Sequence, residues 1–415
     1  MEGKEVVEKL QEMIKDPRLV EISRLKATAF TRRRKGGMGF EDALCFMMDM
    51  WKSTLQTRLN RFYREREGGK AISQSAFTQL RAQFSHKPFE VMMRGLVQRE
   101  YRGRESLPTW QGYHVLTTDG SYVQLPSTPE LAKEFGIRGG GERPGAGISA
   151  LYDVLHGWVL DAEIDHTDRN ERESLTRHID FLTENLPNIA LRALLLLDRG
   201  YPSHDTLQKC EGAGLKYVMR CSTQSFGAVN EAPMGDSVVT IKNGQTVRVM
   251  KFPLNSGEVE TLITNLFDLP ESEFPSLYAM RWGVETLFHE LKRIMSLEKF
   301  SGKTPNAIRQ DFWVSMLLLN AAAVFQKEAD DAIANRHKHK NVKHAYRART
   351  SDLIVTLRDR FIFATLCGHP KLSDWELSNI MRDLSRAISP VRTDRLFPRS
   401  PKPFAAARLN LKSVL

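Results

Sequence analysis

ALLLLDRGY runs from Ala193 to Tyr201 and places an aspartate directly after five consecutive apolar residues. A short apolar run that ends in charge and glycine is typical of a strand buried on both faces of a sheet. We therefore predict a central strand with Asp198 at its carboxyl end. Binding sites in open α/β sheets tend to form at such ends, although an aspartate there also commonly caps a turn.

The segments on either side of this strand indicate the fold. Three alternating segments precede it, and a helix lies between them and the strand. A second helix and one more strand follow it. In chain order the flanking segments are HVLTTDGSYVQLP (114–126), AGISALYDVL (146–155), WVLDAEID (158–165), NERESLTRHIDFLTENL (170–186), HDTLQKCEGAG (204–214) and KYVMRC (216–221). Three antiparallel strands, helix, strand, helix, strand is the order of an RNase H-like α/β domain, in which the first and fourth strands are neighbours.

A second β-rich stretch follows. SVVTIKNGQTVRVMKF (237–252) places Asn243-Gly244 between alternating segments, which predicts a hairpin with a type I′ turn. One more strand is expected in GEVETLITNLFDLPE (257–271). We therefore predict an α/β fold whose RNase H-like catalytic domain is interrupted by a β-rich insertion, with helical N- and C-terminal regions. The expected regions are a helical DNA-binding region (1–105), the catalytic domain's first part (106–221), the insertion (222–269), the catalytic domain's second part (270–330) and a helical, basic C-terminal region (331–415).

YAMRWGVETLFHELK (278–292) is predicted to form one helix with two different faces. At about 100° per residue, four polar side chains fall within a stripe of about 60°. They are Tyr278, Arg281, Glu285 and Lys292. The apolar side chains lie opposite, where they would face a core.

Three carboxylates are expected to converge on this stripe. Asp119 lies in the middle of the first strand, Asp198 ends the fourth, and Glu285 comes from the helix. Carboxylates brought together repel one another unless cations bind them, and oxygen ligands favour Mg²⁺ or Mn²⁺. Two such ions would suit phosphodiester transfer. Arg281, Lys292 and the Tyr278 hydroxyl would then contact phosphates.

Each of these residues also has an ordinary structural explanation. Asp119 precedes a glycine, as many turn aspartates do. Glu285 and Lys292 could belong to a solvated, salt-bridged face of the helix. Only their joint placement on two strands and one helix favours the catalytic interpretation.

The composition favours a polyanionic partner. Lys and Arg number 60 against 50 Asp and Glu, a formal charge of +10. In the N-terminal region, LQTRLNRFYREREGGKAISQSAFTQLRAQF (55–84) predicts two helices joined by a glycine turn, with Ser73 as N-cap of the second. The pair is basic through Arg58, Arg61, Arg64, Arg66, Lys70 and Arg81. It is either a DNA-binding helix-turn-helix unit or a solvated helical hairpin.

Four scattered cysteines without CxxC spacing indicate a reducing compartment. The charged opening MEGKEVVEKLQEMIKD predicts no signal peptide, and WVSMLLLNAAAVF (313–325) is too short to span a bilayer. We expect a cytoplasmic protein without a membrane partner.

The spacing Tyr278-x2-Arg281-x3-Glu285-x6-Lys292 resembles the YREK signature of the IS-four family of bacterial insertion-sequence transposases, a branch of the DDE transposases. The resemblance extends over residues 111–309. It includes TDGS around Asp119, LLLLDRGY around Asp198, TNL before the helix, and a long gap before Glu285 that accommodates an insertion.

The resemblance implies a transposase that binds terminal inverted repeats, nicks DNA with water and joins the freed 3′ hydroxyl to target DNA. Asp119, Asp198 and Glu285 would be the catalytic metal ligands, and Tyr278, Arg281 and Lys292 would hold DNA phosphates. The expected cofactor is two Mg²⁺ ions, with Mn²⁺ as a substitute. The partner would be double-stranded DNA, bound by a homodimer in a synaptic complex at the bacterial nucleoid. The alternatives are an RNase H-like nuclease without strand transfer and an inactive DNA-binding remnant.

One departure from the family concerns the insertion. Relatives carry a tryptophan there that stacks on a flipped base, whereas residues 222–269 contain none. Phe226, Phe252 or Phe267 could substitute, because stacking needs only an aromatic face.

Overall fold

The computed structural model describes residues 1–30, 37–49, 53–65, 71–102, 107–139, 141–254, 257–294, 297–340, 342, 344–362 and 370–391. The chain divides into two compact units. One comprises residues 97–123 and 135–290, and we call it the sheet unit. The other comprises residues 1–96, 124–134 and 291–415, and we call it the helical unit. Each is described by itself.

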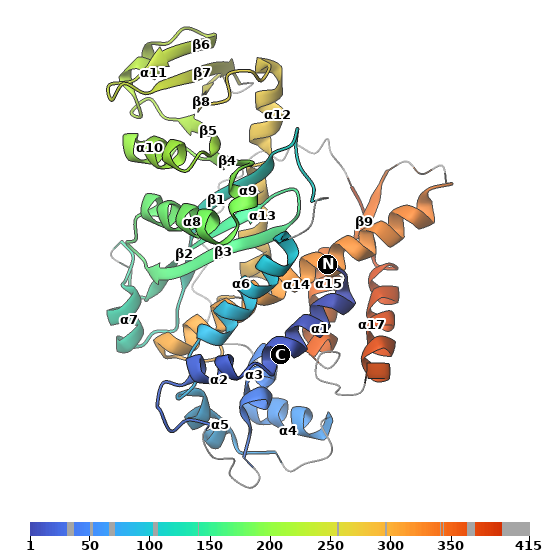
Figure 1. Cartoon of the computed structure of the whole chain (residues 1–415). Helices are drawn as coiled ribbons and strands as arrows, with labels where there is room; N and C mark the ends of the chain where they lie inside the picture. The colour runs from blue at the N-terminus through green and yellow to red at the C-terminus, as the bar shows by residue number, and fades with distance from the viewer. Residues whose placement is uncertain are drawn as a thin grey trace. The chain divides into compact units, whose positions relative to one another are not determined.

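The sheet unit is built on an eight-stranded mixed sheet in the order β3-β2-β1-β4-β5-β8-β7-β6. Its strands, labelled in Figure 1, are β1 (His114–Gln124), β2 (Gly145–Asp153), β3 (Trp158–His166), β4 (Ala193–Leu197), β5 (Lys216–Cys221), β6 (Gly235–Thr240), β7 (Thr246–Pro253) and β8 (Val259–Thr264). The first five strands have the RNase H-like order, and β6, β7 and β8 extend the same sheet as an antiparallel addition to β5.

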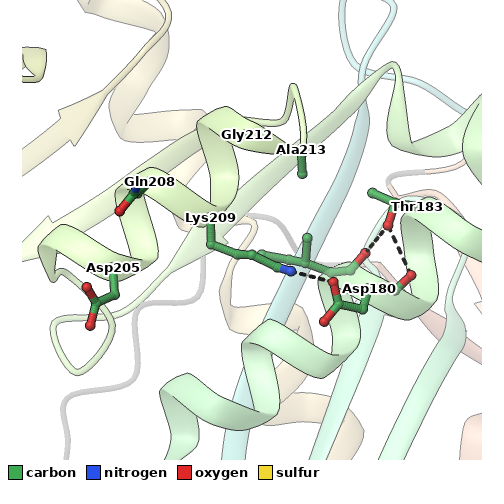
Figure 2. Close-up of a pocket in the computed structure, with 8 residues that line it drawn as sticks. Asp180, Thr183, Asp205, Gln208, Lys209, Gly212 and Ala213 are labelled. Atoms are coloured by element: carbon green, nitrogen blue, oxygen red, sulfur yellow. Dashed lines mark hydrogen bonds and ion pairs between the residues drawn. The ribbon is translucent and has the colours of Figure 1, made fainter.

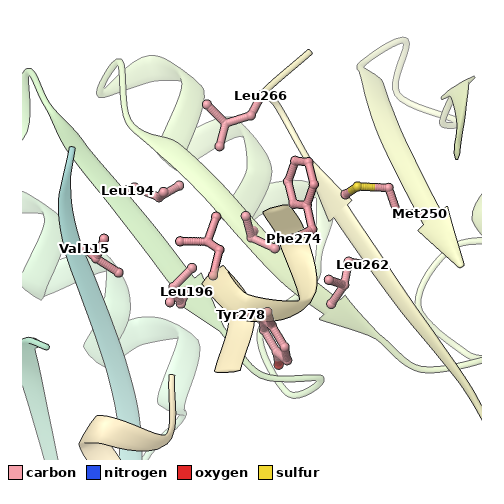
Figure 3. Close-up of a cluster of buried hydrophobic side chains, with 10 residues drawn as sticks. Val115, Leu194, Leu196, Met250, Leu262, Leu266, Phe274 and Tyr278 are labelled. Carbon is pink, nitrogen blue, oxygen red and sulfur yellow. The ribbon is translucent and has the colours of Figure 1, made fainter. Parts of the chain in front are cut away.

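β4 occupies the centre of this sheet because all five of its side chains are apolar and buried. It pairs in parallel with β1 on one side and with β5 on the other. The predicted neighbourhood of the first and fourth strands is therefore confirmed. The apolar cluster on this sheet includes Val115, Leu194 and Leu196, with Phe274 and Tyr278 packed over them (Figure 3).

The helices of the sheet unit connect its strands or follow the last of them, β8. They are α8 (Glu171–Asn185), α9 (Pro187–Ala190), α10 (His204–Gly212), α11 (Gly227–Glu231), the 3₁₀ turn η1 (Glu271–Glu273), α12 (Phe274–Ala279) and α13 (Trp282–His289). A short helix that the sequence analysis did not predict, α7 (Pro129–Phe135), lies between β1 and β2 in the chain.

The prediction of one continuous helix from Tyr278 to Lys292 is wrong. α12 ends at Ala279, α13 starts at Trp282, and the π-helical turn η2 (Glu290–Ile294) follows. Between α12 and α13 the backbone makes tighter bonds three residues apart, from Arg281 N–H to the Tyr278 carbonyl and from Val284 N–H to the Arg281 carbonyl. The tighter backbone bonds between α12 and α13 and the wider π-helical turn after α13 both change the rotation per residue. A constant rotation of 100° per residue therefore does not hold over this stretch.

The predicted hairpin between β6 and β7 exists, but the type I′ turn is wrong. That turn needs positive φ at both central residues. Among the described residues outside glycine, positive φ occurs only at Phe30 and Gln111, so Asn243 does not have it, whereas Gly244 has φ 85°. The Gly244 N–H instead donates to the Ile241 carbonyl, and the Asn243 side chain accepts from the Gln245 N–H.

The N-terminal part of the helical unit contains α1 (Gly3–Ile14), α2 (Pro17–Ser23), α3 (Phe40–Met48), α4 (Leu55–Glu65), α5 (Gln74–Arg81) and α6 (Lys87–Tyr101), which continues into the sheet unit. Ser73 caps α5 as predicted, accepting a hydrogen bond from Ala76 N–H.

Two of the arginines that make this helix pair basic are internal and do not face solvent. Arg58 is 7% exposed and donates to backbone carbonyls of Phe46 and Asp49. Arg81 donates to Gln310 and forms an ion pair with Asp311 at 3.1 Å. Arg66 and Lys70 lie outside the described residues.

The C-terminal part of this unit is dominated by α14 (Pro305–His337), a 33-residue helix whose central stretch is buried. It is followed by β9 (Tyr346–Ala348), α15 (Thr350–Thr356), the π-helical turn η3 (Leu357–Phe361), α17 (Pro370–Leu384) and β10 (Ile388–Pro390). β9 and β10 form a small antiparallel sheet within the C-terminal region that the sequence analysis predicted to be helical. Of the helices in the described ranges, none has the length and apolar character needed to cross a membrane.

Candidate active site

Asp119 and Asp198 lie side by side on neighbouring strands. The parallel register of β1 and β4 ends with Thr117 opposite Leu196, and each aspartate lies two residues beyond that pair. The Thr117 hydroxyl also donates to the Leu196 carbonyl at 2.9 Å, which ties the strands together just before the aspartates. The two aspartates therefore occupy neighbouring positions at one edge of the parallel part of the sheet.

Arg281, the N-cap residue of α13, connects the carboxylates. Its Nη2 donates to Oε1 of Glu285 at 2.9 Å, and its Nη1 lies 3.9 Å from Oδ2 of Asp119. The negative charge of Asp198 also acts on this guanidinium. Asp119 and Glu285 thus contact the same buried cation, on which the charge of Asp198 also acts.

The Arg281 guanidinium has unused donors. Its side chain is 6% exposed, yet Nε and Nη1 make no hydrogen bond to any part of the chain that the structure describes. Unbonded buried N–H groups are costly, and they become favourable when an acceptor such as a phosphate oxygen binds them.

The environment of the Asp119 carboxyl disfavours its ionised form. Burial raises its pKa to about 6, and the charges of Glu171 and Asp198 act in the same direction, while the Gly120 N–H and Arg281 oppose them. A carboxylate that is hard to ionise in the isolated protein gains most from a nearby divalent cation.

Tyr278 and Lys292 are placed differently from the prediction. Tyr278 is 7% exposed in the apolar cluster of Figure 3, and its hydroxyl donates to the Leu197 carbonyl at 3.3 Å, next to Asp198. Burial raises the pKa of this phenol. Lys292 belongs to the helical unit, so its placement relative to the other five residues is not described. The phosphate-contact roles of both residues remain predictions.

A buried polar chain supports the backbone of Asp119. Ser149 on β2 hydrogen-bonds the Asp119 carbonyl at 3.2 Å, His178 on α8 contacts Ser149 at 3.1 Å, and Asp161 on β3 contacts His178 at 2.8 Å. These residues have the composition of a hydrolase triad, but each is at most 2% exposed. A substrate cannot reach them, so their role is structural.

Glu171 is a further acidic residue near Asp119 that the sequence analysis did not select. It is the first residue of α8, directly after the N-cap residue Asn170. The sequence did contain one sign of such a neighbour. A glycine follows each aspartate shortly, at Gly120 and Gly200, and a glycine leaves room for a neighbouring side chain.

Comparison with known proteins decides the family. Residues 110–321, just over half of the 415-residue chain, match the family model described as a transposase DDE domain. The chain belongs to the DDE transposases. It is 24% identical over 329 residues to the transposase InsG for insertion sequence element IS4 of Escherichia coli strain K12, which covers 71% of this chain and 69% of that protein.

The structure is also similar to that of a piggyBac transposase in a synaptic complex with hairpin DNA. The TM-score is 0.50 at 13% identity, covering 92% of this chain and 85% of that one. At this identity the likeness concerns the fold alone, and it agrees with the RNase H-like sheet order. The chain is thus a DDE transposase, an enzyme that cleaves DNA and transfers the cut strands.

DDE transposases generally use divalent metal ions. The acidic residues of this transposase offer only oxygen donors, which suits a hard divalent cation. Within the described residues, no three Asp, Glu, His or Cys side chains are grouped tightly enough to hold one ion. The cation that contacts Asp119 and Glu285 is instead Arg281.

The aromatic candidates in the transposase's insertion differ in exposure. Phe226 is 6% exposed and contacts His204 edge to face, and Phe252 packs against the core cluster. Phe267, just after β8, is 47% exposed. Of the three, Phe267 alone presents a large free surface for stacking on a base.

A surface hollow lies elsewhere on the sheet unit. It has a volume of about 570 Å³ between α8 and α10, and its lining includes Thr183, Asp205 and the ion-paired Lys209 and Asp180 (Figure 2). None of the predicted catalytic residues lines it.

Proposed function

We propose that this transposase cuts transposon ends and joins them to target DNA using Asp119, Asp198 and Glu285 as ligands of two Mg²⁺ ions, for which Mn²⁺ substitutes. The observation that carries the proposal is the shared contact of Asp119 and Glu285 with Arg281, beside the aspartate pair on β1 and β4. This contact supports a common role for carboxylates that come from two strands and one helix.

The bound ions would activate the attacking oxygen and stabilise the leaving oxygen of the phosphodiester. Arg281 would hold a phosphate oxygen through Nε and Nη1, the two nitrogens without hydrogen bonds in the described structure. Because the guanidinium is buried, its orientation is fixed. A fixed charge would stabilise the transition state more than a mobile charge on the surface would. Lys292 would add a second positive charge. Tyr278 would hold the carboxyl end of β4 in place, through its bond to Leu197, and contact the DNA backbone.

The proposed partner is double-stranded DNA, as terminal inverted repeats and as target, bound by a homodimer in a synaptic complex. The formal charge of +10 supports a polyanionic partner. The similar piggyBac structure is a synaptic complex with hairpin DNA, which supports the same type of assembly here. The proposed location is the bacterial cytoplasm, at the nucleoid, since the InsG relative comes from Escherichia coli.

The test uses DNA that carries the ends flanking the gene, incubated with the protein and Mg²⁺. We expect 3′ nicking and joining to target DNA. Nicking without joining would favour a nuclease, and binding without either would favour an inactive remnant. Glu285→Gln should bind DNA but not cleave it, whereas the control Glu273→Gln, on the turn before α12, should cleave normally. Normal cleavage by Glu285→Gln would show that the site is assigned wrongly.

A further inference from the structure

Three polar contacts meet at the Ser149 hydroxyl, behind the backbone of Asp119. The hydroxyl oxygen lies 3.2 Å from the Asp119 carbonyl oxygen, 3.1 Å from His178 Nε2 and 3.4 Å from the Thr118 hydroxyl. Ser149, His178 and Thr118 are each at most 1% exposed. Buried polar groups are hydrogen-bonded, so these side chains depend on one another for partners.

The directions of these bonds follow from the chemistry of each group. A hydroxyl has one hydrogen to donate and two lone pairs that accept, whereas a backbone carbonyl only accepts. The bond to Asp119 therefore uses the one hydrogen of the Ser149 hydroxyl. For all three contacts to be hydrogen bonds, His178 Nε2 and the Thr118 hydroxyl must both donate to Ser149.

Asp161 contacts the other side of the imidazole. Its Oδ2 lies 2.8 Å from His178 Nδ1, and Asp161 is 2% exposed. A carboxylate only accepts, so Nδ1 carries a hydrogen as Nε2 does. Arg177 and Arg169 form ion pairs with Glu163, on the same strand as Asp161. The doubly protonated ring supplies a positive charge to the buried Asp161 carboxylate, which would be costly to bury without one.

The support acts at a place where β1 has lost one of its neighbours. The pairing of β1 with β4 ends at Thr117, two residues before Asp119. Beyond that point, the bond from Ser149 on β2 holds the Asp119 carbonyl, and His178 on α8 holds Ser149. The position of Asp119 thus depends on a chain of bonds that begins at Asp161.

We propose that His178 is a positioning residue for Asp119, and that its Nε2–H holds Ser149 with the serine hydroxyl donating to the Asp119 carbonyl. The inference rests on the proposed function, because it requires that the position of Asp119 decides the rate of DNA cleavage. Misplacing a catalytic group by about 1 Å can slow a reaction about 100-fold.

The first experiment reads the protons of His178 directly. Nitrogen-15 NMR of the histidine rings in the full-length protein distinguishes a nitrogen that carries hydrogen from one that does not. His178→Asn identifies the signals of this ring by their loss. We expect both ring nitrogens to carry hydrogen near neutral pH. An Nε2 without hydrogen would mean that Ser149 donates to His178 and not to Asp119, which would overturn the inference.

The second experiment separates the two bonds of the imidazole. The amide of His178→Gln reaches Ser149 in place of Nε2, whereas the shorter amide of His178→Asn reaches only Asp161 in place of Nδ1. We expect single-turnover nicking of end DNA to fall by about tenfold or more in Ser149→Ala and His178→Asn, but by at most about threefold in His178→Gln. DNA affinity should stay unchanged in all three. The control Ser315→Ala should cleave normally, because it removes an equally buried hydroxyl that bonds to the Asp311 carbonyl within α14.

The outcomes separate the two proposals. If His178 served folding alone, cleavage by the two His178 variants would follow their stability, measured by denaturant unfolding, and would not follow the bond to Ser149. That result, or wild-type cleavage by Ser149→Ala when Asp119→Asn is inactive, would overturn the positioning role and leave the proposed active site standing. Normal cleavage by Asp119→Asn would remove the active site and the positioning role together. The NMR result does not depend on cleavage.

Discussion

Arg281 Nη1 lies 3.9 Å from Asp119 Oδ2, although the two residues belong to different elements far apart in the chain. The same guanidinium donates to Glu285 at 2.9 Å. The planar guanidinium of arginine carries several N–H donors and reaches both carboxylates from one position. The single ammonium of a lysine cannot do this. Arg281 therefore links the aspartate on the sheet to the glutamate on the helix.

Arg281→Lys should therefore reduce DNA cleavage by about 100-fold, because a point charge replaces the buried fork that would hold the phosphate. Mn²⁺ binding should persist, since the carboxylates remain. The measurement is single-turnover nicking of end DNA. Cleavage at the wild-type rate would exclude Arg281 as the phosphate contact.

Asp119→Asn should stabilise the metal-free protein at pH 7.5. Burial, mainly, raises the pKa of Asp119 from 3.8 to about 6, so its stabilising contribution is complete below pH 3.8 and is lost as the pH rises through 6. Above pH 6 the ionised carboxylate is a cost of about 3 kcal/mol at most. The neutral amide avoids that cost.

Denaturant unfolding in EDTA at several pH values measures this effect. The advantage of Asp119→Asn should be about 1–3 kcal/mol at pH 7.5 and should shrink as the pH falls from 6 toward 4. An advantage that is the same at every pH would mean that the Asp119 charge is not its cause.

His114 should make the protein sensitive to acid. It is 1% exposed at the start of β1, and its two ring nitrogens have no hydrogen-bond partner among the described residues. Burial lowers its pKa from 6.5 to about 4, and the charges of Arg192 and His156 act in the same direction. Between pH 6.5 and 4 the unfolded chain is protonated here and the folded chain is not, so the free energy of unfolding falls as the pH falls.

His114→Leu removes this titration, so its stability should decline less than that of wild type between pH 6.5 and 4. The exposed His339→Asn is the control and should follow wild type. Parallel pH profiles for wild type and His114→Leu would refute the assignment.

The strands and the neighbouring positions of the two aspartates were predictable from the apolar pattern of the strands and their order in the chain. The apolar run before Asp198 is typical of a strand that is buried on both faces at the centre of a sheet. The order of the elements then makes β1 the neighbour of β4. The break between α12 and α13 was not predictable, because nothing in Ala279, Met280 or Arg281 forbids a helix. Local helix propensity alone predicts that the helix continues through this point.

The positions of two arginines and one glutamate were also not predicted, because contacts outside their own segments determine them. Arg58 and Arg81 add to the basic charge of the helix pair, but the Phe46 carbonyl, 12 residues away, and Asp311, 230 residues away, accept hydrogen bonds from them. Glu171 looks like an ordinary first-turn acid until the Gly120 backbone is placed beside it. Long-range partners decide these roles, and single-sequence patterns do not contain them.

Gly283 tests whether the close contact of α13 with the sheet matters for catalysis. An added Cβ would lie 2.9 Å from Cγ1 of Val154 and 3.4 Å from Tyr152. Alanine favours a helix by about 1 kcal/mol over glycine, but overpacking costs about 1–3 kcal/mol. We expect the overpacking to dominate, so Gly283→Ala should lower stability and, by moving Glu285, slow DNA cleavage.

The compensating change is Val154→Ala, which removes the Cγ1 atom that the new methyl group would meet. The double variant should recover cleavage relative to Gly283→Ala alone, even though Val154→Ala by itself removes apolar contacts and lowers stability. Such recovery in a double-mutant cycle, measured by both unfolding and nicking, would tie the position of α13 to the sheet contact. Additive losses in both measurements would show instead that Gly283 acts through some other contact than Val154.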